Sequence, residues 1–300
     1  MASTPSAPFV KLYDLLMDRR ESGAPESVQR ARAGMEAAAL PAHDDVTVEP
    51  TVYGGCPAEW ISTPNSEPDH IVLHLHGGGF VMGSLDTHRK LAGDIANATR
   101  ARVLLLDYPL APEAPFPAAI DAITDAMREI RNEFPGVAVT IAGDSAGGNL
   151  VITSMLSMHA AGVALPDAAA CISPWTDLAR PDGFSPDLAL IDPVVTPDAL
   201  DTMRDWYLAE QDPTSPLATP HLGDLSMMPP LLIQVGESEI LLDDARLLAE
   251  RARRSGVEVT LEEWPHMVHV WHVFAGRIPE STEAVQRLGA FLHEHSSTGH

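Results

Sequence analysis

Short apolar runs alternate with helical patterns from residue 70 onward. The segments 71–76, 102–108, 137–143, 168–173, 230–236 and 257–264 have the length and composition of buried strands. Apolar residues recur at helical spacing in 87–99, 117–134, 146–161 and 281–295. Strands that alternate with helices are typical of βαβ units around a parallel sheet. We therefore predict an α/β fold in which helices flank a mostly parallel central sheet.

Two regions depart from this rhythm. Residues 1–45 have helical character and precede "VTVEPTVYGGCPAEWIS", an alternating pattern with a Gly-Gly turn that indicates an antiparallel hairpin. Residues 175–229 are rich in Pro, Asp and Ser and include a helical piece at 197–210. We expect residues 1–45 and an insertion at about 178–225 to form a small helical cap, with 46–300 as the main domain.

Composition and charge exclude several classes of partner. Asp and Glu number 42 against 19 Lys and Arg, a formal charge of -23, which disfavours nucleic acid and anionic membranes. Cys56 and Cys171 lie far apart, so a disulfide framework is not expected. The N-terminus lacks the pattern of a signal peptide, and no apolar run approaches the ~20 residues of a membrane span. These features predict a cytoplasmic protein.

One turn has the pattern of a nucleophile. Gly143-Asp144-Ser145-Ala146-Gly147 fits G-x-S-x-G and lies between a predicted strand and a predicted helix. A tight turn at this point forces the serine into a strained backbone conformation, for which small neighbours leave room. The serine oxygen then lies at the N-terminus of a helix, whose dipole favours developing negative charge. We therefore predict Ser145 as a nucleophile.

A glycine-rich segment, "HLHGGGF", follows the strand at 71–76. When a serine attacks a carbonyl group, the carbonyl oxygen becomes an oxyanion that requires fixed hydrogen-bond donors. Glycines allow backbone N–H groups to approach that oxygen, and the N–H of Ala146 is the expected further donor. A phosphate-binding loop is the alternative, but neither G-x-G-x-x-G nor a Gly-Lys-Ser/Thr ending is present.

Three histidines, His266, His269 and His272, follow the last predicted strand. A serine needs a base to take its proton, and a loop at this edge of the sheet is the place for one. The spacing i, i+3, i+6 also allows a metal site, but there is no H-E-x-x-H and no nearby Cys/Asp cluster. We expect neither a metal nor a cofactor, and spacing alone does not select one histidine as the base.

The base requires an acceptor that fixes its tautomer. The strand at 230–236 is followed by "ESEILLDD", which offers four carboxylates: Glu237, Glu239, Asp243 and Asp244. A serine, then an acid, then a histidine is the chain order expected of α/β-hydrolases.

With these residues in place, the sequence resembles the bacterial hormone-sensitive-lipase family of esterases, which are α/β-hydrolases. The family motif "HGGGF" matches residues 76–80, and "GDSAGG" matches residues 143–148. "YRLAPE" matches residues 108–113, with Pro109 in place of Arg. The likeness extends through "GSLDTHRKLA" and "SPWTDL" and covers residues 70 to 295.

The resemblance implies an α/β-hydrolase fold with a small helical cap, and it implies roles for individual residues. The resemblance implies that Ser145 is the nucleophile and that the oxyanion donors are Gly78, Gly79 and Ala146. The acid motif D-x-L-x-D aligns on residues 239–243, so Glu239 stands where Asp is usual. The motif G-M-x-H aligns on residues 266–269, which makes His269 the base and places His266 where Gly is common.

The activity implied is that of a carboxylesterase acting on small-molecule esters with acyl chains of about two to eight carbons. An aromatic content of 5% and the short insertion favour a compact acyl pocket. If the base is unperturbed, activity should rise with pH through a pKa of about 6 to 7.

An amidase, deacetylase or lactonase with the same triad is the alternative function. A non-catalytic receptor on this fold, similar to the plant gibberellin receptor, is a more distant alternative. Relatives pair through the last strand, so a homodimer through 257–264 is a further expectation.

Overall fold

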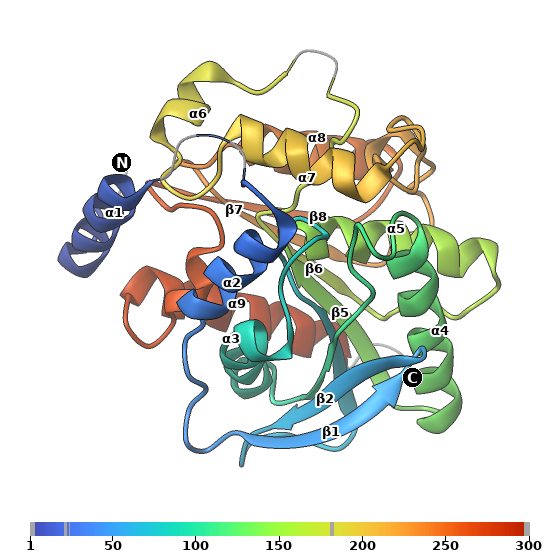
Figure 1. The fold of residues 1–300 in the computed structure, drawn as a ribbon. Coiled ribbons are helices and arrows are strands. Elements are labelled where there is room, and N and C mark those ends of the chain that lie inside the picture. The colour runs from blue at the N-terminus through green and yellow to red at the C-terminus, as the bar shows by residue number, and fades with distance from the viewer. Residues whose placement is uncertain (1–3, 21–22, 24, 181–182, 297–300) are drawn as a thin grey trace.

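The computed structural model describes residues 4–20, 23, 25–180 and 183–296. In these ranges, eight strands form one sheet, which crosses the middle of the molecule (Figure 1). Their order is β1-β2-β4-β3-β5-β6-β7-β8. The antiparallel part is the predicted hairpin of β1 (Thr47–Tyr53) and β2 (Cys56–Ser62), which pairs with β4 (Arg102–Leu106). The parallel strands that join β4 are β3 (His70–Leu75), β5 (Ala138–Asp144), β6 (Ala169–Ile172), β7 (Leu231–Gly236) and β8 (Val259–Trp264). The predicted strands and the α/β fold are confirmed. A homodimer through the edge strand β8 stays a prediction.

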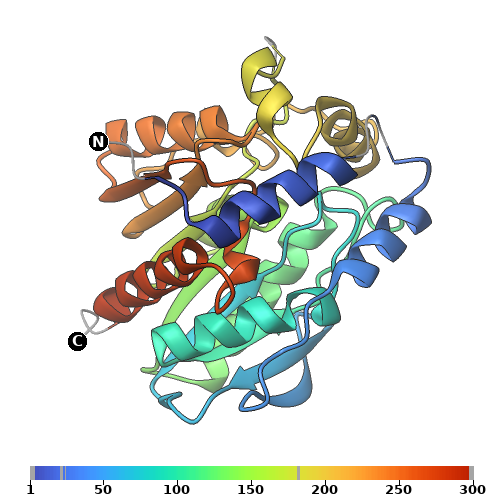
Figure 2. The same cartoon turned by 90° about the vertical axis from the view of Figure 1, so that its left-hand side faces the viewer.

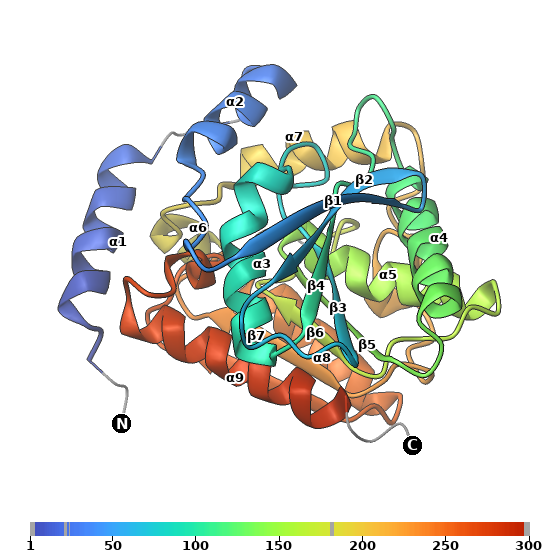
Figure 3. The ribbon, with the colours of Figure 1, turned by 90° about the horizontal axis from the view of Figure 1, so that it is seen from below.

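Helices cover both faces of the sheet (Figure 3). On one face lie α3 (Leu85–Thr99) and α9 (Pro279–Ser296). On the other lie α4 (Ala118–Glu133), α5 (Ala146–Ala160) and α8 (Leu242–Arg254). The sequence analysis identified only the acidic residues at the start of α8 and did not predict the helix itself, much of which consists of charged residues. In the described part of the chain, no helix combines the length and apolar character that crossing a membrane requires.

Each face of the sheet has its own apolar core. In β3, the side chains of Ile71, Leu73 and Leu75 enter the core beneath α4, α5 and α8. Val72, between them, enters the core beneath α3 and α9. Successive strand residues point to opposite faces, so a strand covered on both sides is apolar throughout. The apolar residues of β3 follow from its place inside the sheet, although the buried His74 interrupts their run.

Two segments far apart in the sequence lie side by side at one end of the molecule (Figure 2). These are the N-terminal helices α1 (Ala7–Arg19) and α2 (Val28–Ala38), and the insertion that contains α6 (Pro186–Ile191) and α7 (Pro197–Leu208). Tyr13 of α1 donates a hydrogen bond to the carbonyl of Ile191 at 2.8 Å, and Arg20 donates to the carbonyl of Ala189 at 2.6 Å. The predicted helices are confirmed. The division into a cap (1–45 and about 178–225) and a domain (46–300) stays a prediction, and its ranges include residues 1–3, 21, 22, 24, 181, 182 and 297–300, which lie outside the described residues.

Candidate active site

Ser145 stands at the turn between β5 and α5. Its φ of 54° and ψ of -118° are unfavourable for a residue with a side chain, so the predicted strain is confirmed. Its N–H donates to the carbonyl of Ile172 at 2.8 Å, and its carbonyl accepts from the N–H of Trp175 at 3.1 Å. A Cβ atom on Gly147 would collide with the carbonyl oxygen of Leu75. The small residues are therefore needed for the close approach of β3 to this turn.

The glycine-rich loop follows β3, the neighbour of β5 in the sheet. Gly78 and Gly79 have φ values of 119° and 60°, in the region that glycine adopts without steric cost. A Cβ atom on Gly78 would collide with the carbonyl group of Met82. The N–H of Ala146 lies in the first turn of α5, where a backbone N–H has no partner within the helix. The predicted oxyanion donors thus follow two adjacent parallel strands.

His269 and Glu239 are in direct contact. His269 Nδ1 lies 2.7 Å from Glu239 Oε2. A carboxylate only accepts hydrogen bonds, so Nδ1 carries the proton, and Nε2 of the neutral ring is the atom that can accept another. Glu239 is fully buried, and its Oε1 also accepts from Ser173 Oγ at 2.8 Å and from the N–H of Gly236 at 2.6 Å. These donors hold the carboxylate in one orientation.

The surroundings of His269 favour its charged form. Burial lowers the pKa of this imidazole, and the side chain is only 8% exposed. The hydrogen bond and charge of Glu239, followed by the charges of Asp192 and Asp144, outweigh burial and raise the pKa above its ordinary value. The imidazolium that forms when a base takes a proton is therefore stabilised at this position.

The structure separates the four candidate carboxylates. Glu237 and Asp243 are exposed. Asp244 is buried, but its Oδ2 accepts two backbone N–H groups from the segment after β6, at 2.9 and 2.8 Å. Glu239 is the one of the four that is hydrogen-bonded to His269.

The other two histidines of the loop have different surroundings. His266 is exposed and has a φ of 67°, in the left-handed region that glycine adopts without steric cost. His272 is fully buried, and its Nε2 lies 2.8 Å from Gln234 Oε1. Across the described residues, no group of three or more His, Cys, Asp or Glu side chains is placed to hold a metal ion.

Two residues near this site were missed in the sequence. Ser173 donates to Glu239 and accepts the N–H of Val270 at 3.1 Å, so it joins the acid to the loop of the base. It lies in the matched stretch "SPWTDL", to which no role was given. Asp192 acts on His269 through its charge. Nothing in its local sequence distinguishes it among 42 acidic residues.

Buried histidine and tyrosine side chains support the glycine-rich loop on the side that faces the protein interior. The N–H of Gly77 donates to His88 Nε2 at 3.2 Å. The ring of His76 stacks on Tyr108 with 4.3 Å between centroids, and the Tyr108 hydroxyl donates to the carbonyl of His76 at 2.6 Å. Burial lowers the pKa of His76 to about 3, so this ring is neutral near pH 7. The matched motif at 108–113 therefore has a structural role beneath the loop.

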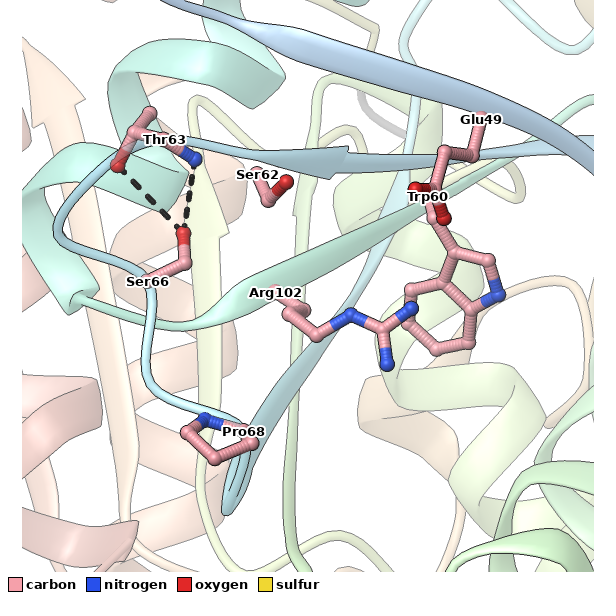
Figure 4. A pocket seen from close by; sticks show the side chains of 7 residues that line it. All are labelled: Glu49, Trp60, Ser62, Thr63, Ser66, Pro68 and Arg102. Carbon is pink, nitrogen blue, oxygen red and sulfur yellow. Dashed lines mark hydrogen bonds between the residues drawn. The ribbon is translucent and has the colours of Figure 1, made fainter.

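A polar hollow of about 250 Å³ lies elsewhere, over β2 and β4 (Figure 4). The guanidinium group of Arg102 lies 4.3 Å from the ring centroid of Trp60 in its wall. None of the predicted site residues lines this hollow, so we assign it no part in the chemistry.

Comparisons with known proteins agree with this arrangement. A family model for the α/β-hydrolase fold matches residues 72–273, from β3 to just past the loop of His269. The match spans well over half of the chain, which therefore belongs to the α/β-hydrolase family. An acetyl-hydrolase of Streptomyces hygroscopicus is 42% identical over 272 residues, which cover 90% of this chain and 89% of that protein. An esterase of Acinetobacter venetianus is 33% identical over 256 residues, 84% of each chain.

A solved structure narrows the class. A crystal structure of an esterase from the bacterial hormone-sensitive lipase family superposes with a TM-score of 0.92 at 38% identity, covering 98% of this chain and 100% of that one. Within the α/β-hydrolases, the chain is thus a member of the bacterial hormone-sensitive lipase family. The resemblance seen in the sequence motifs is confirmed.

Proposed function

We propose that the chain is a carboxylesterase that hydrolyses short-chain acyl esters through an acyl-enzyme on Ser145. Its family and its relatives make it a carboxylic ester hydrolase. The observation that carries the proposed mechanism is the 2.7 Å contact between His269 Nδ1 and Glu239 Oε2. It leaves Nε2 of a buried imidazole available as a base, on a loop at the same edge of the sheet as the strained serine.

The first half of the reaction forms the acyl-enzyme. Ser145 Oγ attacks the carbonyl carbon of the ester while His269 Nε2 takes the hydroxyl proton. The carbonyl oxygen becomes an oxyanion that accepts hydrogen bonds from the N–H groups of the glycine loop and of Ala146. The carbon–oxygen bond to the alcohol then breaks, and His269 gives its proton to the departing alcohol oxygen.

The second half releases the acid. A water molecule attacks the acyl carbon while His269 Nε2 takes one of its protons. The bond between that carbon and Ser145 Oγ breaks, and the serine oxygen receives the proton from the imidazolium. Glu239 keeps its negative charge throughout and stabilises the imidazolium in both halves.

Aromatic packing above the glycine loop supports a small acyl group. The ring of Phe80 stacks on Tyr207 of α7 with 3.9 Å between the ring centroids. The centroid of the Trp175 ring lies 5.4 Å from that of Phe80. A Cβ atom on Gly79 would collide with Met203 Sδ, so α7 lies directly over the loop. The close cover favours acyl chains of about two to eight carbons over long lipid chains.

Replacing the nucleophile tests the mechanism. Ser145→Ala should reduce hydrolysis of p-nitrophenyl butyrate by about 10⁴-fold or more, because no oxygen remains to form the acyl-enzyme. The wild type should be labelled by an organophosphate at Ser145, as seen by mass spectrometry of peptides. The exposed Ser226→Ala is the matched control and should retain activity. Undiminished activity of Ser145→Ala would refute the assignment.

A substrate panel separates esterase from amidase, deacetylase and lactonase activity. p-Nitrophenyl esters of increasing chain length should give the highest kcat/KM at about two to eight carbons. The corresponding anilides, N-acetyl amines and lactones should be much poorer substrates. A higher kcat/KM for any of these classes would replace the esterase proposal.

A further inference from the structure

Asp192 is a buried carboxylate just after α6, in the insertion between β6 and β7. It is 0% exposed. Its Oδ1 accepts the N–H groups of Val194 at 2.8 Å and Val195 at 2.9 Å. Its Oδ2 accepts the N–H of Ile240 at 2.8 Å. Three N–H donors favour the charged form of a buried carboxylate.

The bond to Ile240 joins the insertion to the loop of the proposed catalytic acid. Ile240 directly follows Glu239 in the chain. The side-chain carboxylate of Glu239 is hydrogen-bonded to His269. The carbonyl that precedes Asp192 in the chain accepts the hydroxyl of Tyr13, from α1 beside α6 (Figure 1). The carboxylate therefore connects the helices at this end of the molecule with the acid and the base.

The negative charge of Asp192 also raises the pKa of the proposed base, His269. Burial lowers the pKa of His269, and the three carboxylates of Glu239, Asp192 and Asp144 raise it. The charge of His269 acts on Asp192 in turn, and the charge of Asp192 also raises the pKa of Tyr13. Burial raises the pKa of Asp192 above its ordinary value, and the charge of His269 and the three N–H groups limit that rise. The two side chains thus favour each other's charged forms.

We propose that Asp192 is a positioning residue for the ester hydrolysis, an inference that rests on the proposed function. Through the N–H of Ile240 it holds the main chain next to Glu239, and so fixes the carboxylate that orients His269. Its negative charge stabilises the imidazolium that forms when Ser145 is deprotonated. The insertion therefore acts on the charge state of the base as well as covering the glycine loop.

Asp192→Asn in the full chain tests this inference, because it removes the charge and nearly preserves the shape. The acid limb of the pH profile of kcat/KM reports the pKa of the base in the free enzyme. It should move to lower pH by about half a unit to one unit, since a favourable negative charge is lost. At the plateau, kcat should fall about 10-fold while KM changes less than twofold, because the charge acts in the transition state.

Asp244→Asn is the matched control. Asp244 is also fully buried and also accepts two N–H groups, from the segment after β6, and it forms an ion pair with Arg180. It is hydrogen-bonded to neither the acid nor the base. Asp244→Asn should lower the melting temperature and leave the acid limb of kcat/KM unchanged. A lowered melting temperature with an unchanged acid limb in Asp192→Asn as well would overturn the inference.

Asp192→Ser provides a second uncharged variant, with a hydroxyl that can accept the N–H of Val194. It should show the same shift of the acid limb. If both variants fail to fold, as judged by circular dichroism, Asp192 serves to stabilise the fold and the inference is wrong. The wild type and Ser145→Ala are measured in parallel. An active Ser145→Ala would reject the proposed function, whereas an inactive Ser145→Ala beside an unshifted Asp192→Asn would reject this inference alone.

Discussion

His266 shows how the backbone conformation of one residue constrains its identity. Its φ of 67° lies in the left-handed region, which costs a residue with a Cβ atom about 1–2 kcal/mol. The side chain is exposed and takes no part in the proposed chemistry. A histidine at this position therefore destabilises the loop that carries His269.

His266→Gly should increase the free energy of unfolding by about 0.5–1 kcal/mol, because relief of the backbone strain exceeds the entropy that glycine adds to the unfolded chain. Urea denaturation measures this change, and kcat/KM should be unaffected. His266→Ala retains a Cβ atom and should give no stabilisation. Equal stabilisation by glycine and alanine would contradict the explanation.

At the scale of elements, the packing of α7 on the loop after β3 covers the site. Phe80, with a φ of 65°, stacks on Tyr207 and contacts Trp175. Phe116 packs edge-on against Tyr207, and its N–H donates to the carbonyl of Tyr207 at 2.9 Å. These aromatic contacts join the insertion to the loop that supplies two of the predicted oxyanion donors.

Phe80→Ala should reduce the free energy of unfolding by about 3–5 kcal/mol, the usual cost of removing a buried phenylalanine ring. It should also raise KM, because α7 loses its contact with the loop. Thermal unfolding and steady-state kinetics measure the two effects. Val52→Ala, at a side chain that is 63% exposed, is the control and should change neither. A wild-type melting temperature for Phe80→Ala would show that α7 is held by other contacts.

At the scale of the whole molecule, burial keeps several histidines uncharged. Burial lowers the pKa of His70 and His74 to about 4, and that of His76 and His272 to about 3. In the unfolded chain these groups return to a pKa of about 6.5. Between those values the unfolded state binds more protons, so the free energy of unfolding falls as pH falls below about 6.5.

His70→Gln should make this loss less steep. His70 lies at the start of β3 with its Nε2 3.0 Å from Thr140 Oγ1, a contact that the glutamine amide can replace. Between pH 6 and 5, the free energy of unfolding of the variant should fall less than that of the wild type, by about 1 kcal/mol per pH unit. Urea denaturation at pH 7.5, 6 and 5 gives the slopes. Equal slopes would mean that His70 is not kept neutral by burial.

The sequence by itself determined the features that depend on neighbouring residues. Alternation of apolar runs and helical patterns predicted the parallel strands, because a strand covered on both faces needs apolar residues throughout. Glycine and serine spacing predicted the strained turn at Ser145, because such a turn admits only small neighbours. The helix α8 was missed, although its buried apolar residues recur at helical spacing: Leu242, Ala245, Leu248, Ala249 and Ala252.

The tertiary structure decided which distant residues meet. Glu239 and His269 are 30 residues apart, and Ser173 and Glu239 are 66 apart. The resemblance to the family's acid motif pointed to Glu239, but its contact with His269 and the role of Ser173 could not be read from local spacing. The order of strands in the sheet brings their loops to one edge. The interactions of Asp192 with Ile240 and His269 arise in the same way, from an insertion packed above that edge. Such contacts depend on the relative placement of whole elements, which neither apolar periodicity nor a short motif encodes.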